Sequence, residues 1–216
     1  MAKNDTVLDV GAGTGKLSRM LASSPLGLNI VALEPNQDMR KQGVQKTNFD
    51  QVSWCCGTAE KSGQSRESFR LVTFGSSFNV VDQKLALRET ARVLKPGAWF
   101  ACLWNHRDID DELQCKIEKS ISRQLPEYSY GLRREDQHSI IDSNGSFKHI
   151  QKFSSPHIAT VKRAHFMQAW NSHLTLKRQA GAKFESIIKA IDCLAPASNT
   201  LQIPYTTVVW MAQCQK

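Results

Sequence analysis

Short apolar runs alternate with amphipathic segments through the first hundred residues of the chain. A helix is predicted over residues 81–94, because its apolar residues recur at helical spacing. Strands that alternate with helices in this way predict βαβ units, with a parallel sheet and helices on both of its faces. Five apolar runs of strand length are expected to form this sheet, at residues 6–10, 29–33, 52–55, 71–74 and 99–104.

The alternation breaks down beyond residue 105. We expect helices over residues 110–123 and within 164–194, and strands at 147–153 and 201–214. The result would be a single α/β domain over residues 1–216, with a seven-stranded, mostly parallel sheet. Its core is expected at 5–105, 146–163 and 200–216, and an inserted helical cap at 106–145 and 164–198.

A glycine-rich turn follows the first predicted strand, in the segment Asp9-Val10-Gly11-Ala12-Gly13-Thr14-Gly15. Glycine lets a backbone turn sharply and approach a ligand closely, and such ligands bind at the carboxyl ends of parallel strands. The dinucleotide pattern G-x-G-x-x-G fails, because its third glycine would fall on Lys16. The phosphate loop fails as well, because it needs glycine at Val10 and Ser or Thr at Leu17.

Glu34 lies at the end of the second predicted strand. A carboxylate at this place can accept hydrogen bonds from both hydroxyls of a ribose, as the acid of dinucleotide sites does. The alternative is that Glu34 only caps the helix that follows.

Four motifs together resemble the class I S-adenosylmethionine (SAM)-dependent methyltransferases, which have a Rossmann-like fold. Within that class the chain is similar to the type 11 group, which includes trans-aconitate methyltransferase-like enzymes. The resemblance covers about residues 5–105, and the segment 204–210 is similar to the group's last strand. The motifs are Asp9-x-Gly11-x-Gly13-x-Gly15, Ala32-Leu33-Glu34-Pro35-Asn36, Gly57-Thr58-Ala59-Glu60 and Arg92-Val93-Leu94-Lys95-Pro96-Gly97.

The resemblance implies SAM as the cofactor and a role for each matching position. Asp9 would orient the glycine turn, and the backbone of Gly11, Ala12 and Gly13 would cradle the amino acid part of SAM. Glu34, followed by Pro35, would hold the ribose hydroxyls. The remaining cofactor contacts are expected from Thr58 and Ala59 at the adenine edge, and from Phe74 and Gly75 on the methionine side.

Three departures separate the chain from that group. The group usually has Phe-Asp-Leu where this chain has Phe69-Arg70-Leu71. It often has Ala-Phe-His-Trp where this chain has Ser77-Phe78-Asn79-Val80. The chain also begins about five residues before the first strand, where the group usually has a segment that closes over SAM. We therefore expect an open cofactor site, weaker SAM affinity and an N-terminal truncation.

Residues for the methyl acceptor are expected at strand ends and in the cap. Asn79 and His106 are the candidate catalytic groups, although a lone histidine at a strand end is commonly a hydrogen-bonding loop residue. Aromatic and cationic side chains in the cap would suit a carboxylate; the alternative is a solvated loop. The candidate substrate contacts are Phe78, Asn79, Trp104, Asn105, Tyr130 and Arg134.

Charge and composition narrow the partners. The net charge of +8 is consistent with a solvated basic surface or with a pocket that attracts an acidic small molecule. We expect no nucleic-acid partner, because the basic residues form no run, and no membrane partner, because no apolar run has the length to span a bilayer. The chain has no secretion signal and its six cysteines form no C-x-x-C pair, so we expect cytoplasmic free thiols and no metal site.

The predicted function is transfer of a methyl group from SAM to a small molecule, with acidic compounds among the candidates. A catalytically impaired SAM-binding or interaction module is an alternative, and an NAD-dependent oxidoreductase is a second. Neither the acceptor atom nor the oligomeric state follows from the sequence.

Overall fold

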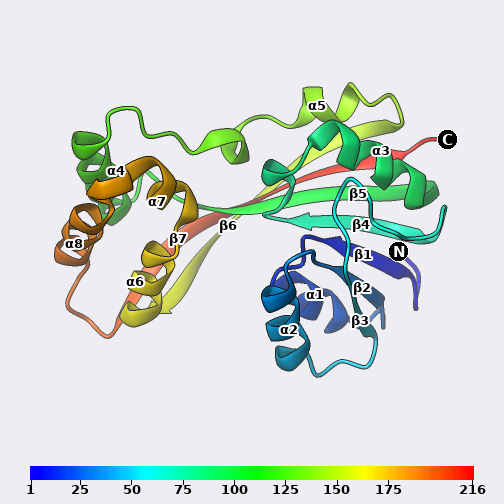
Figure 1. The fold of residues 1–216 in the computed structure, drawn as a ribbon, viewed down its shortest axis with the longest axis horizontal. Helices are drawn as coiled ribbons and strands as arrows, with labels where there is room; N and C mark the ends of the chain where they lie inside the picture. The colour runs from blue at the N-terminus through cyan, green and yellow to red at the C-terminus, as the bar shows by residue number, and fades with distance from the viewer. The chain divides into compact units, whose positions relative to one another are not determined.

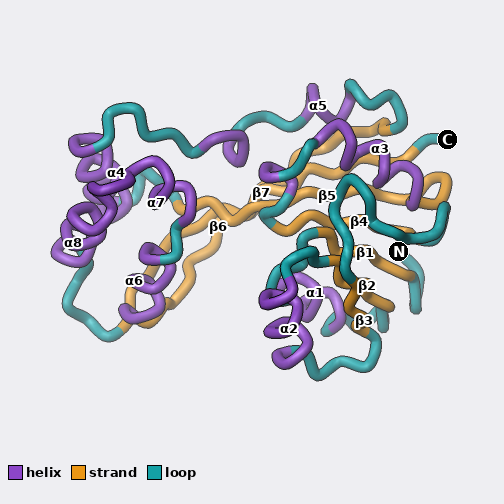
Figure 2. The backbone as a smooth tube through the Cα atoms, viewed as in Figure 1, coloured by secondary structure: helices purple, strands orange, loops and turns teal.

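The computed structural model describes all residues from 1 to 216. It contains seven strands, eight α-helices and three short 3-10 helices (Figures 1 and 2). The strands are β1 (Thr6–Val10), β2 (Asn29–Leu33), β3 (Val52–Cys55), β4 (Phe69–Gly75), β5 (Leu94–Arg107), β6 (Phe147–Lys162) and β7 (Thr200–Cys214). The α-helices are α1 (Lys16–Ala22), α2 (Gln37–Lys46), α3 (Gln83–Val93), α4 (Glu112–Gln124), α5 (His138–Asp142), α6 (Arg163–Asn171), α7 (Leu174–Ala180) and α8 (Phe184–Leu194). The 3-10 helices are η1 (Phe78–Val80), η2 (Gly131–Arg134) and η3 (Gly181–Lys183).

The seven strands form one sheet in the order β3-β2-β1-β4-β5-β7-β6. Strands β1 to β5 pair in parallel, and Val7 lies between Ile30 on β2 and Leu71 on β4. The chain runs outward from β1 to β3 and then returns to the other side of β1 with β4. At such a reversal, next to the carboxyl ends of β1 and β4, open α/β sheets have the crevice that binds their ligands.

Both faces of the central strands are buried. Val7, Leu71 and Ala101 pack on one side with Ala22 of α1. Their neighbours in sequence pack on the other side with α3 and α5, because successive side chains of a strand point to opposite faces. This alternation confirms the predicted α/β sheet with helices on both faces. The core on the side of α3 and α5 includes Leu8, Val72, Phe100, Leu87 and Ile141.

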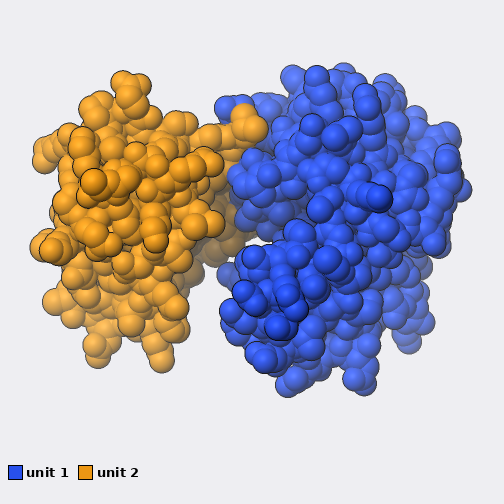
Figure 3. Space-filling view, viewed as in Figure 1, with its two compact units in different colours: residues 1–104, 135–153, 208–216 blue, residues 105–134, 154–207 orange.

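The chain divides into two compact units (Figure 3). Unit 1 comprises residues 1–104, 135–153 and 208–216, and unit 2 comprises 105–134 and 154–207. These bounds differ from the expected core and cap, since 135–145 belong to unit 1 and 154–163 and 200–207 to unit 2. The single-domain organisation stays a prediction.

Unit 2 has a hydrophobic core of its own, built from helices α4, α6, α7 and α8. Ile117 and Ile121 of α4 pack in it with Trp170 of α6 and Ile187 and Ile191 of α8. Both isoleucines of α4 face the same way because they are four residues apart. None of the helices is long and apolar enough to cross a membrane.

The first three strands have the predicted bounds, but the four later strands are longer than predicted, β5 and β6 by the most. Strand β5 begins at Leu94 and includes residues 95–97, where its pairing with β4 shifts register. Strand β6 continues to Lys162, and most of its residues are exposed. An exposed strand has no apolar alternation, so the hydrophobic pattern could not mark its full length.

Candidate functional site

The glycine turn joins β1 to α1 at the sheet crevice. Gly11, Gly13 and Gly15 have φ angles of 67°, 59° and 79°, a region that side chains with a Cβ rarely adopt. The amides of Gly11 and Ala12 donate to the carbonyl of Leu33, at 2.9 and 3.0 Å. The turn therefore lies between a strand and a helix, as predicted, and also closes over the end of β2.

Two of these glycines are also required by close packing. A Cβ on Gly11 would lie 2.6 Å from the Cβ of Ser77, whose hydroxyl donates to the carbonyl of Val10 at 2.6 Å. A Cβ on Gly15 would lie 2.8 Å from the indole ring of Trp54. Gly15 therefore makes room for the half-buried Trp54 of β3, a role that the sequence motif did not suggest.

Asp9 lies beneath the turn and is 1% exposed. Its carboxylate accepts hydrogen bonds from the hydroxyls of Ser18, at 2.6 Å, and Thr73, at 3.0 Å. Burial raises the pKa of Asp9 to about 6, although the hydrogen bonds from Ser18 and Thr73 oppose that rise. The carboxylate thus ties β1 to α1 and β4.

Glu34 connects the glycine turn to the segment before α2. One carboxylate oxygen accepts the amide of Gly13 at 2.8 Å, and the other accepts the amide of Asn36 at 2.8 Å. The cap of α2 is Asn36, whose side chain accepts from the amides of Asp38 and Met39. Glu34 is therefore not the cap residue of that helix.

The geometry around Glu34 fits a ribose. An ionised carboxylate has about four lone-pair sites, and the two backbone amides use one on each oxygen. Each oxygen can therefore accept one further hydrogen bond, which matches the two vicinal hydroxyls of a ribose. Residues 11 and 13 beside it are glycines, and their missing Cβ atoms leave room for Ser77 and Met39.

The other predicted cofactor residues lie in different environments. Pro35 and Thr58 are exposed, and the Thr58 hydroxyl accepts the amide of Lys61 at 3.2 Å. Ala59 is buried in the core beside β2. Phe74 is fully buried and the next residue, Gly75, is half-buried, so only Gly75 at the end of β4 has exposed surface.

Two residues of α2 lie beside Gly13 and Glu34, and the sequence analysis did not predict them. Met39 is 42% exposed, and its methyl group lies 3.3 Å from where a Cβ on Gly13 would be. Arg40 donates to the carbonyl of Glu34 at 2.6 Å and so fixes the backbone that carries the carboxylate. Neither belongs to a motif; only the position of α2 reveals them.

Three candidate acceptor residues belong to unit 1. The amide oxygen of Asn79 accepts the indole N–H of Trp104 at 2.9 Å, and this bond holds the Asn79 side chain. Phe78 is fully buried and packs against Phe74 and Phe100, with ring centroids 5.2 and 5.4 Å apart. The prediction that Phe78 contacts the substrate is therefore wrong, because its ring is buried in the core.

The other candidates belong to unit 2. Asn105 is exposed and accepts the hydroxyl of Thr207 at 2.5 Å, and His106 is buried within β5 rather than in a loop. Arg134 lies 4.6 Å from the ring centroid of Tyr130 and donates to the carbonyl of Arg107 at 2.9 Å. The alternative of a solvated loop does not hold, because the Tyr130 hydroxyl and the Arg134 Nε are buried.

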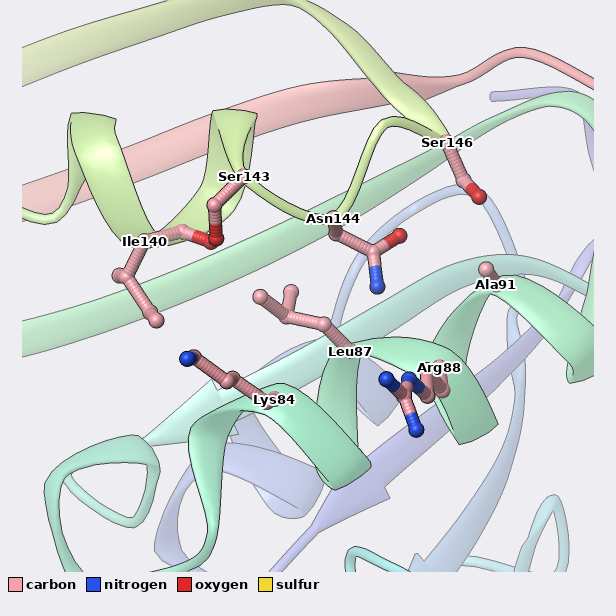
Figure 4. A pocket seen from close by; sticks show the side chains of 8 residues that line it. All are labelled: Lys84, Leu87, Arg88, Ala91, Ile140, Ser143, Asn144 and Ser146. Atoms are coloured by element: carbon pink, nitrogen blue, oxygen red, sulfur yellow. The ribbon is translucent and has the colours of Figure 1, made fainter.

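A cavity of about 370 Å³ lies elsewhere in unit 1, between α3 and the segment around α5 (Figure 4). Lys84 and Arg88 of α3 extend towards it, and Asn144 lies on its other side. None of the predicted cofactor or acceptor residues lines this cavity. Its size therefore does not mark it as the cofactor site.

Comparison with known proteins supports the interpretation of the glycine turn. Residues 8–102 match a family described as a methyltransferase domain. An uncharacterized methyltransferase of Mycobacterium tuberculosis is 38% identical over 102 residues, which cover 47% of this chain and 40% of that protein. A ubiquinone/menaquinone biosynthesis C-methyltransferase of Pectobacterium carotovorum is 28% identical over 157 residues, covering 68% of this chain and 58% of that protein. The matched region thus spans about half the length of these relatives.

Solved structures share the fold. A structure from Anaeromyxobacter dehalogenans, described as a type II methyltransferase, superposes with a TM-score of 0.72 at 17% identity, over 98% of this chain and 91% of that one. Phosphoethanolamine N-methyltransferase 2 of Haemonchus contortus, solved with SAM, superposes with a TM-score of 0.59 at 17% identity, over 100% of this chain and 50% of that one. The match of residues 8–102 and the shared fold support the resemblance to the class I SAM-dependent methyltransferases of the type 11 group.

Proposed function

We propose that this chain binds SAM at the crevice of unit 1 and transfers a methyl group to a small molecule, with acidic compounds among the candidates. The observation that carries the proposal is the Glu34 carboxylate, held by the amides of Gly13 and Asn36 beside the glycine turn. When bound, SAM supplies a methyl group on a sulfonium, which is already a good leaving group.

The cofactor contacts follow from this geometry. The backbone of Gly11, Ala12 and Gly13 holds the amino acid part of SAM, because the glycines leave that backbone bare. Glu34 accepts hydrogen bonds from the ribose hydroxyls with the lone pairs that the amides leave free.

The remaining cofactor surface comes from the ends of the neighbouring strands. Thr58 and Ala59 lie at the adenine edge, with Pro35 beside the ribose. The backbone at Phe74 and Gly75 lines the methionine side.

The chain's chemical task is mainly alignment and exclusion of water, since the transfer needs a base only if the acceptor must lose a proton. Asn79 is a candidate to orient the acceptor, since its amide oxygen is fixed by Trp104 and its amide N–H groups remain as donors. His106 is the candidate base, and Asn105, Tyr130 and Arg134 are candidate acceptor contacts. The cytoplasmic location and the lack of a nucleic-acid or membrane partner stay predictions.

Calorimetry with SAM and with its demethylated product tests the cofactor site. The full chain should bind both, and Glu34→Ala should weaken binding by about 1–3 kcal/mol, the range for hydrogen bonds to a charged group. Glu127→Ala removes an exposed carboxylate of unit 2 and should leave the affinity unchanged.

Two outcomes would contradict the proposal: a folded chain that binds neither compound, or unchanged affinity in Glu34→Ala. Stronger stabilisation by NAD than by SAM would favour an oxidoreductase. Formation of the demethylated product with small-molecule acceptors separates an enzyme from a module that only binds.

A further inference from the structure

Unit 2 contains a cavity whose wall combines aromatic rings with cationic groups. Its volume is about 180 Å³. Phe166, Trp170 and Tyr205 supply apolar surface, and Arg107 and Arg133 supply charge. Pockets for drug-sized ligands have roughly 300–1,000 Å³, so this cavity suits a smaller molecule.

The cationic side of this cavity has too few acidic partners. The Arg107 side chain is 10% exposed, lies 4.0 Å from the centroid of Trp170 and donates to Gln114 at 2.7 Å. Its carboxylate partner is Glu118, at 3.5 Å. Arg133 lies near the same carboxylate and near Arg134, so Arg107 and Arg133 share one acid. Buried charge is unfavourable unless it is paired, and this excess would be relieved by an anion.

Two donors at the cavity have no acceptor. The Nε of Arg133 and the Nε2 of His173 are buried without a hydrogen-bond partner. His173 accepts the amide of Leu176 at its Nδ1, at 3.1 Å, so the ring proton lies on Nε2. Burial, with Arg133 and Arg107 nearby, lowers the pKa of His173 to about 4, so the ring is neutral near pH 7. A ligand that satisfied both donors would bring two acceptor oxygens.

We propose that unit 2 binds a small carboxylate with a compact apolar body. The carboxylate oxygens accept from Arg133 and His173, and the apolar body packs against Trp170, Phe166 and Tyr205. Arginine favours this ligand because its planar fork matches a carboxylate. Carboxylate binding by unit 2 does not depend on the proposed function.

Calorimetry of the full chain with benzoate as the probe tests the proposal. Benzoate should bind, and benzyl alcohol, which has the same ring without the charge, should bind at least about tenfold more weakly. Inorganic phosphate, which has charge without an apolar body, should also bind more weakly than benzoate. Benzyl alcohol or phosphate binding as tightly as benzoate would overturn the assignment, as would no binding of benzoate.

Arg133→Met locates the site, since it removes the charge and retains an apolar stem. Benzoate affinity should fall by at least about tenfold, the effect of one charge-assisted hydrogen bond. Arg178→Met removes an exposed arginine of the same unit and should change nothing. Equal benzoate affinities in the two variants would refute the assignment to this cavity. Binding of the demethylated cofactor product, measured in the same samples, reports on the proposed function separately.

Discussion

The replacement Asp9→Asn should remove a pH dependence that the buried carboxyl imposes on stability. Asp9 is nearly inaccessible to solvent and lies beneath the glycine turn. Ser18 donates both its hydroxyl and its backbone amide to the carboxylate, and Thr73 donates its hydroxyl. Desolvation outweighs these hydrogen bonds and raises the pKa from 3.8 to about 6.

The sign follows from proton binding. Because the pKa is raised in the folded state, the native protein retains a proton on Asp9 at pH values where the unfolded chain has lost it. Stability therefore falls as pH rises between about 3.8 and 6, by up to about 1.4 kcal/mol per pH unit. Well above pH 6, the full pKa shift of about two units lowers the free energy of unfolding by about 3 kcal/mol. Between pH 5 and pH 7 the difference is about 1.3 kcal/mol.

Denaturation by urea, followed by tryptophan fluorescence, measures this effect. The asparagine side chain of the variant does not titrate, so the unfolding free energy of the wild type minus that of Asp9→Asn should drop by about 1.3 kcal/mol from pH 5 to pH 7. Ser18→Ala removes hydrogen bonding that holds the pKa down, so it should enlarge this drop. A difference between wild type and Asp9→Asn that stays constant, or rises with pH, would refute the reasoning.

Two further substitutions test an ion pair and a close contact in unit 1. Glu89 accepts hydrogen bonds from Arg92 and Ser62, and Arg92 chiefly lowers its pKa to about 2. This contribution to stability is present above about pH 4.5 and is lost as pH falls towards 2. Glu89→Gln should therefore reduce the unfolding free energy by about 1–3 kcal/mol at pH 7 and by less near pH 3.5. Equal losses at the two pH values would contradict this reasoning. A Cβ on Gly43 would lie 2.1 Å from the Trp54 ring, so Gly43→Ala should destabilise by about 1–3 kcal/mol, although alanine favours a helix by about 1 kcal/mol over glycine. The loss should disappear in a Trp54→Leu background, and a double-mutant cycle that shows no coupling would contradict the clash.

The sequence determined the central part of the fold because local and global signals agree there. Strands β1, β2 and β3 have the predicted bounds, since each is a short apolar run between helical segments or turns. The glycine turn and Glu34 were predictable for the same reason. The end of a strand, a glycine that can adopt a positive φ angle and the spacing to the next carboxylate can all be read from short stretches of sequence.

Tertiary structure decided what each of these residues contacts. Met39 reaches the turn only because α2 folds back along the sheet, and Phe78 fills the core only because Phe74 and Phe100 leave room for its ring. The exposed length of β6 depends on hydrogen bonds to a neighbouring strand, which leave no trace in apolar periodicity.

The sequence indicated aromatic and cationic side chains in the cap, but only the structure shows which of them line the cavity of unit 2. Arg107, Arg133 and His173 are separated by 26 and 40 positions, and each alone resembles an ordinary surface cation or helix residue. Folding brings them to one wall and buries their donors. The energy of a buried charge depends on which groups surround it in space, and the order of residues along a chain does not specify that environment.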